Sequence, residues 1–191
     1  MIILLIGLAL FLGIHSVRLF ADNLRSMAID QIGGGKWQAA YAIVSLVGII
    51  LIVYGYGQAR VNASILWEAP LGGVYIVSLL MLCAFIMFAA VYVPGTHLKA
   101  RIGHPMLVGV KLWAFSHLIV NGGIADVFLL GSFLLWAILC FKAARKRDQL
   151  ENRVYEVIGV KRDLIAIGIG FSGLLVFSLF FHQVLIGVPV Y

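Results

Sequence analysis

Charged side chains are scarce in this sequence. Only 12% of the 191 residues are Asp, Glu, Lys or Arg, whereas 63% are hydrophobic. Soluble domains carry about 25% charged and about 45–50% apolar residues, and a chain this short cannot bury such an excess in one core. The composition therefore excludes a soluble enzyme and a disordered segment, and it leaves an integral membrane protein as the expected class.

Cysteine motifs and strand-like patterns are also lacking. The two cysteines, Cys83 and Cys140, each lie inside an apolar run, and there is no CxxC or CxxCH motif. This pattern excludes a disulfide scaffold and covalent c-type haem attachment. The apolar residues form long runs instead of alternating ten-residue segments, which favours helices over a barrel.

Six apolar runs are each long enough, or nearly so, to cross a hydrocarbon core about 30 Å thick. They cover residues 1–20, 37–57, 71–93, 105–121, 124–143 and 164–186. No basic stretch precedes the first run, so we expect it to stay as a helix and not to be cleaved as a signal peptide. The sequence predicts an all-α polytopic membrane helix bundle of about six transmembrane helices, forming a single domain over residues 1–191.

Lysine and arginine lie mostly on one side of this predicted bundle. One of the 14 cations, Arg60, lies on the opposite side, and Lys111 lies inside a span. The others flank the first, third and fifth connections; they are Arg18, Arg25, Lys36, Lys99, Arg101, Lys142, Arg145, Lys146, Arg147, Arg153, Lys161 and Arg162. Because basic loops stay cytoplasmic, both termini are expected on the periplasmic side.

The connection between the last two spans carries its own pattern. In residues 144–162, apolar side chains recur at helical spacing among charges, at Leu150, Val154, Val157 and Ile158. This pattern predicts a short helix lying in the cytoplasmic interface. Acidic residues interrupt the basic ones, so we expect no binding of nucleic acid by this segment.

Carboxylates are missing from the membrane core, whereas histidine and isolated cations are present. This absence argues against carboxylate acid–base catalysis and against a transporter with a carboxylate relay, and the sequence has no HExxH motif. Polar side chains inside a membrane are costly, so each one is a candidate functional residue. These residues are His15 and Arg18 in the first span, Lys111 and His117 in the fourth, and His182 in the sixth, with His104 at the entrance to the fourth.

Depth in the membrane restricts which histidines are able to share a ligand. His15 lies about 21 Å along the first span, and His117 about 20 Å beyond His104. If Lys111 reaches for the cytoplasmic interface, His117 is drawn towards the midplane and His15 and His117 match in depth. His117 and His182 also match, so depth leaves both pairs open. Two imidazoles with two nearby cations suit a b-type haem and its propionates, whereas zinc usually needs three or four ligands.

Several short motifs together resemble the NnrU family over essentially the whole chain. They are HSVR at 15–18, HPML at 104–107, KLWA at 111–114, HL at 117–118, NG at 121–122 and the closing HQVLIGVP at 182–189. The family is associated with nitrite and nitric oxide reductase genes of denitrifying bacteria. The resemblance therefore implies a multi-pass protein of the bacterial inner membrane.

The plant enzyme 15-cis-ζ-carotene isomerase is a relative of this family and an integral membrane haem b protein. The resemblance implies haem b, with its iron bound by His15 and His117. Arg18 and Lys111 are then the expected partners of the propionates, and His104 and His182 are further residues of the cofactor region. Where the isomerase has an additional redox-linked cysteine, this chain has Ala114, so the resemblance supports haem binding more strongly than it supports ligand switching or the isomerase reaction.

The hypothesis from the sequence is thus a membrane haem b protein linked to nitrogen-oxide respiration, or to redox or isomerase chemistry on a lipophilic substrate. Its expected partners are the lipid bilayer and either a lipophilic small molecule or a redox partner, and not nucleic acid. The alternative is a cofactor-free assembly or regulatory subunit of a denitrification complex, in which the histidines serve only helix packing.

Overall fold

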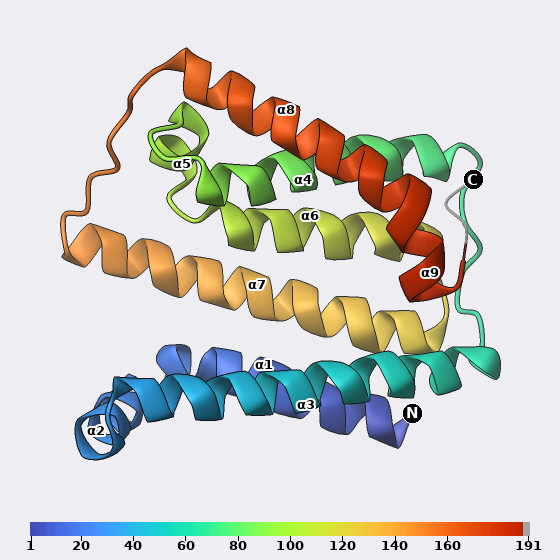
Figure 1. Ribbon diagram of the computed structural model, residues 1–191. Helices are drawn as coiled ribbons and strands as arrows, with labels where there is room; N and C mark the ends of the chain where they lie inside the picture. Colours follow the sequence, from blue (N-terminus) through green and yellow to red (C-terminus); the bar gives the residue numbers. More distant parts are fainter. Residues whose placement is uncertain (189–191) are drawn as a thin grey trace. The chain divides into compact units, whose positions relative to one another are not determined.

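A computed structural model describes residues 1–188 of the chain, so the last part of the closing motif, from Pro189, lies outside the described residues. The described part is helical (Figure 1). Its elements are α1 (Ile2–Phe20), α2 (Asp22–Ile32), α3 (Gly34–Val61), α4 (Gly73–Tyr92), α5 (His97–Ile102), α6 (Pro105–Val120), α7 (Ile124–Leu150), α8 (Val160–Val176), the π-helical turn η1 (Phe177–Phe181) and α9 (His182–Ile186).

Five of these helical segments are long and apolar enough to span a membrane. They are α1, α3, α4, α7 and the stretch Val160–Ile186, whereas α6 is a shorter apolar helix. Large apolar side chains face outward along the spans; Ile43 and Leu46 of α3, for example, are 63% and 60% exposed. Such exposure suits a lipid solvent. The all-helical bundle of about six spans is confirmed.

The chain divides into two compact units, which are described separately. The first combines residues 1–69 with residues 121–136, and the second combines residues 70–120 with the chain from residue 137 onward. Helix α7 contributes its first half to the first unit and its second half to the second.

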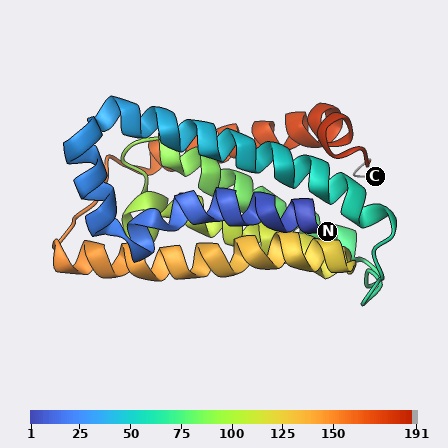
Figure 2. The same cartoon turned by 90° about the horizontal axis from the view of Figure 1, so that it is seen from below.

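Close packing of α1 against α3 forms the core of the first unit, where the two helices lie side by side (Figure 2). They run antiparallel, because Gly7 meets α3 near Ile52 and Gly48 meets α1 near Phe11. A Cβ atom added at Gly7 would lie 2.6 Å from the Ile52 nitrogen, and one added at Gly48 would lie 2.9 Å from Phe11. Small residues of this kind let helix backbones approach closely inside a membrane.

The connections at one end of the first unit are held by backbone and side-chain hydrogen bonds. The Leu66 N–H donates to the Gly122 carbonyl at 2.7 Å, and the Ile124 N–H donates to the Ser64 carbonyl at 3.0 Å. The Tyr56 hydroxyl donates to Asp126 at 2.5 Å, which fixes the first turn of α7 to α3. These bonds satisfy polar groups at the beginning of a membrane helix.

In the second unit, α4 packs against both α6 and α8 (Figure 1). Small residues again permit the contacts, since a Cβ at Gly170 of α8 would lie 2.7 Å from the backbone of Ile86 in α4. Ala90 and Ala166 are fully buried in the same cluster. Helix α5 is tied to α8 by His97, whose Nδ1 lies 2.6 Å from Asp163.

The separate interfacial helix expected over residues 144–162 is not observed, and this prediction is wrong. Helix α7 continues to Leu150, and residues 153–159 have no helical structure. Asn152 adopts a left-handed conformation with φ 47°, and the Arg153 N–H donates to the Asp148 carbonyl while the Asn152 N–H donates to the Gln149 carbonyl. This is a Schellman C-cap, so the helix ends despite the helical periodicity that follows it.

Candidate cofactor site

His15 lies near the end of α1 and is surrounded by aromatic rings in the first unit. Its ring stacks on Phe11 at a centroid separation of 4.2 Å and lies 5.0 Å from the ring of Tyr41 in α3. Its Nδ1 lies 2.7 Å from the Phe11 carbonyl oxygen. Because a carbonyl oxygen only accepts, Nδ1 must carry the proton, and in the neutral imidazole Nε2 then presents a lone pair.

Trp136 supplies a second polar atom beside this imidazole. Its ring meets His15 edge-on at 6.1 Å. The indole Nε1–H is buried and has no hydrogen-bond partner among residues 1–188. Leaving a buried N–H without an acceptor is costly, so the indole is suited to donate to an acceptor atom of a bound molecule.

A pocket at the junction of α2 and α3 shares Tyr41 with these aromatic residues. It has a volume of about 270 Å³, and its lining residues are Arg25, Ile29, Gly34, Trp37, Gln38 and Tyr41. Tyr41 thus contacts His15 and also lines the pocket. Arg25 brings a cation to the pocket, although its Nη1 also lies 3.3 Å from Asp22. Arg18, the cation expected to serve a cofactor, is exposed in the last turn of α1.

His117 repeats the arrangement of His15 within the second unit. Its Nδ1 lies 3.0 Å from the carbonyl oxygen of Trp113, four residues earlier in α6. The fully buried Ser116 donates to the same carbonyl at 2.9 Å. Six residues before His117 in α6, Lys111 places its ammonium 3.8 Å from the centroid of the Phe141 ring, a cation–π contact inside the apolar environment.

His182 follows the π-helical turn η1. Its Nδ1 lies 2.8 Å from the Val188 carbonyl oxygen, and the ring of Phe177 meets it edge-on at 6.1 Å. All three histidines of the predicted spans therefore direct Nδ1 to a backbone carbonyl. Hydrogen bonding alone does not distinguish His182 from the other two.

His104 is placed in a different cluster of the second unit. Its Nε2 lies 2.9 Å from Oδ2 of Asp148, whose side chain is only 7% exposed. The Tyr155 hydroxyl donates to the same oxygen at 3.0 Å, and Arg145 lies 3.9 Å from it. Burial, together with the hydrogen bond to this carboxylate, raises the pKa of the Tyr155 phenol. His104 thus contacts the end of α7, a contact that its position before Pro105 did not indicate.

His15 and Arg18 lie in the first unit, and His104, Lys111, His117 and His182 lie in the second. The structure also shows neighbours that the sequence did not single out. Phe11, Tyr41 and Trp136 lie around His15, and Arg25 lines the pocket to which Tyr41 also belongs. Only Phe11 had a local signal, because it lies one helical turn before His15. Within residues 1–188, no three His, Cys, Asp or Glu side chains converge as ligands of a metal ion.

Comparison with known proteins identifies one family. The NnrU protein family matches residues 3–190, which is nearly the whole chain and includes both units. No curated protein and no solved structure matches the chain. The resemblance inferred from the HP, KLWA and HL motifs is confirmed.

Proposed function

The chain belongs to the NnrU protein family, and from this premise we propose that it is a membrane protein of nitrogen-oxide metabolism that binds haem b. His15 is proposed as one axial ligand of the iron and His117 as the other. The observation that carries the proposal is the setting of His15, whose Nδ1 donates to the Phe11 carbonyl beside the buried indole N–H of Trp136, which has no acceptor within residues 1–188. His117 directs its own Nδ1 to the Trp113 carbonyl in the same way.

Metal-ligating histidines typically donate their second ring N–H to a carbonyl or a carboxylate, which fixes the tautomer and the ring orientation. His15 does so to the Phe11 carbonyl at 2.7 Å, and His117 does so to the Trp113 carbonyl at 3.0 Å. In both cases the acceptor lies one turn earlier in the same helix. If Nε2 of each imidazole binds iron, the hydrogen bond from Nδ1 to the backbone carbonyl stays in place.

The surroundings of His15 also suit a large planar group with acidic substituents. Phe11, Tyr41 and Trp136 provide aromatic surface, and the unpartnered indole N–H of Trp136 offers a hydrogen bond to an acceptor. Carboxylates such as propionates are best held by Arg or Lys. Arg18 and Lys111 remain the proposed partners, and Arg25 joins them because it lines the pocket that Tyr41 shares.

When bound, haem would supply one-electron redox chemistry or a site for a diatomic molecule. The protein's own contribution is to fix two imidazole tautomers, to exclude water with aromatic side chains and to balance the propionate charges. Such a centre fits electron transfer or sensing of a nitrogen oxide in the membrane.

The test is a set of three matched substitutions, His15→Ala, His117→Ala and His182→Ala, in protein purified in detergent after expression with ample haem precursor. His182 is a suitable control because its Nδ1 also bonds a backbone carbonyl. The wild type should carry stoichiometric haem with a six-coordinate low-spin spectrum. His15→Ala and His117→Ala should each give five-coordinate or haem-depleted protein, and His182→Ala should keep the wild-type spectrum.

Rescue separates loss of a ligand from loss of folding. In His15→Gly, added imidazole should restore the low-spin spectrum, because a free imidazole occupies the space that the side chain leaves. If His182→Ala abolishes six-coordination while His15→Ala does not, His15 is not a ligand, and the pair is His117 with His182. A folded wild-type protein that takes up no haem would instead favour the cofactor-free subunit.

A further inference from the structure

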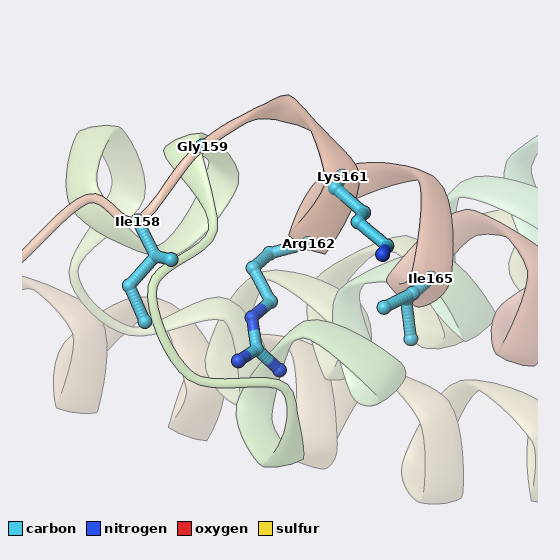
Figure 3. A pocket seen from close by; sticks show the side chains of 5 residues that line it. All are labelled: Ile158, Gly159, Lys161, Arg162 and Ile165. Atoms are coloured by element: carbon cyan, nitrogen blue, oxygen red, sulfur yellow. The ribbon is translucent and has the colours of Figure 1, made fainter.

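A second pocket lies where the chain enters α8, in the second unit (Figure 3). Its volume is about 440 Å³, and its lining residues are Ile158, Gly159, Lys161, Arg162 and Ile165. The Lys161 and Arg162 side chains extend from the first turn of the helix, and Ile158 and Ile165 stand on either side of them (Figure 3). The pocket thus combines two cations with two branched apolar side chains.

The two cations have no neutralising side chain beside them in the described part of the chain. Within the part of the chain that the structure describes, neither the Lys161 nor the Arg162 side chain has an ion-pair partner. The next residue, Asp163, accepts from the Leu98 N–H at 3.2 Å and lies 2.6 Å from His97. Its carboxylate is therefore engaged with α5, and among residues 1–188 no carboxylate forms an ion pair with Lys161 or Arg162.

Ile158, which forms one wall of the pocket, is held in place by contacts with Gly95. The Ile158 N–H donates to the Gly95 carbonyl at 2.9 Å, and its side chain covers Gly95 so closely that a Cβ there would collide with it. Ile158 and Ile165 are nevertheless 56% and 39% exposed. Rigid apolar surface therefore remains open directly beside the two positive charges.

The position along the chain identifies the kind of molecule that meets this pocket. Residues 161–163 are charged, and the apolar part of the span begins immediately after them. A membrane helix changes from charged to apolar at the level of the phospholipid headgroups. Anionic phospholipids, which offer a phosphate to the cations and an apolar portion to the isoleucines, lie at that level and attract basic segments.

We propose that this pocket binds the headgroup of an anionic phospholipid of the phosphatidylglycerol type. Arg162 offers a planar fork of donors to two phosphate oxygens, and Lys161 adds a point charge. Ile158 and Ile165 contact the glycerol and the first methylenes of the acyl chains. The site does not depend on haem, and it gives the second unit a defined lipid contact in addition to the general bilayer solvent.

The test compares lipids by native mass spectrometry of the full chain released from detergent. Dioleoylphosphatidylglycerol should bind as a discrete adduct, and dioleoylphosphatidylcholine should bind far more weakly. The double substitution Lys161→Gln with Arg162→Gln should weaken phosphatidylglycerol binding by about thirtyfold, the factor expected from two cations near an anionic headgroup. The matched control, Lys142→Gln with Lys146→Gln, removes two exposed charges from α7 and should leave the affinity unchanged.

A double substitution that exchanges the two cations distinguishes loss of charge from misfolding. Lys161→Arg with Arg162→Lys keeps both cations and should keep phosphatidylglycerol binding within a few-fold, so loss of binding there would contradict the proposed role of charge. Equal weakening by the α7 control would mean unspecific surface attraction and would overturn the site. Inorganic phosphate should fail to compete at equal concentration, and if it displaces the lipid, the pocket binds free anions.

Discussion

Helix α1, which carries His15, depends on its close approach to α3, and the substitution Gly7→Ala tests that dependence. The added methyl group would lie 2.6 Å from the Ile52 nitrogen, 2.9 Å from the Leu51 carbonyl carbon and 3.0 Å from the Gly48 carbonyl oxygen. All three neighbours are backbone atoms, so no side-chain rotation relieves the clash. The two helices would have to move apart.

The cost follows from the size of that movement. Carbon atoms make their best contact at about 3.5–4.0 Å, so the helices would separate by about 1 Å around Gly7. A gap of that size forfeits about a quarter to a half of the attraction between neighbouring atoms, and overpacking generally costs about 1–3 kcal/mol. At Gly13 of the same helix, nothing lies within 4 Å of an added Cβ, and replacing a helical Gly by Ala there should stabilise by about 0.5–1 kcal/mol.

Thermal unfolding in detergent, followed by circular dichroism, measures the difference between the two variants. Gly7→Ala should unfold below the wild type, Gly13→Ala at or above it, and the two midpoints should differ by roughly 4 °C or more. The loss should also appear as weaker haem retention in Gly7→Ala, because α1 presents His15 from this packing. Equal midpoints for the two variants would refute the close contact of α1 with α3.

Two further predictions concern the connection after α7 and the orientation of the chain. Tyr155→Phe removes the hydrogen bond to the buried Asp148 and should lower the free energy of unfolding by about 1–3 kcal/mol at neutral pH. Burial and Asp148 raise the pKa of Tyr155. The stabilisation by Tyr155 should therefore be present below pH about 10 and should disappear as the pH rises through the folded-state pKa. If the variant loses as much stability in alkali as the wild type does, this explanation is wrong. Reporter fusions after Tyr191 should be active in the periplasm and fusions at Gln149 in the cytoplasm, since cations gather on one side of the spans, and a cytoplasmic carboxyl terminus would break the six-span arrangement.

The spans could be predicted from the sequence because lipid imposes a simple requirement of length and hydropathy. Each predicted run corresponds to a helix, including the short α6, which begins at Pro105 where the sequence placed the fourth span. The residues between the first two spans were not assigned to a helix, although α2 occupies Asp22–Ile32. Its mixed polar composition carries no membrane signal, and a helix of 11 residues is marginal without tertiary support.

The connection after α7 shows where periodicity misleads. Leu150, Val154 and Ile158 are spaced as on a helix, yet the Schellman cap at Asn152 ends α7 and the following residues bond to other parts of the second unit. Tyr155 reaches Asp148, and the Ile158 N–H reaches Gly95. These tertiary hydrogen bonds outweigh the local preference. Asn152 itself was a usable signal, because Asn often adopts the left-handed conformation at a helix end.

The polar residues of the candidate site could be selected from the sequence, whereas their surroundings could not. Histidine inside an apolar span is informative because burial makes each polar group costly, and this singled out His15, His117 and His182. The aromatic neighbours Tyr41 and Trp136 come from other helices, so no spacing within α1 reveals them. The unpartnered indole N–H of Trp136 is likewise a property of packing that only the fold discloses.

The visible absorption spectrum of the wild-type protein, purified in detergent after expression with ample haem supply, tests the proposed function most directly. Two neutral imidazoles bound to iron give a six-coordinate low-spin centre, so we predict a coloured protein with that spectrum in both oxidation states. A folded protein that remains colourless under these conditions would contradict the proposal that His15 and His117 hold a haem.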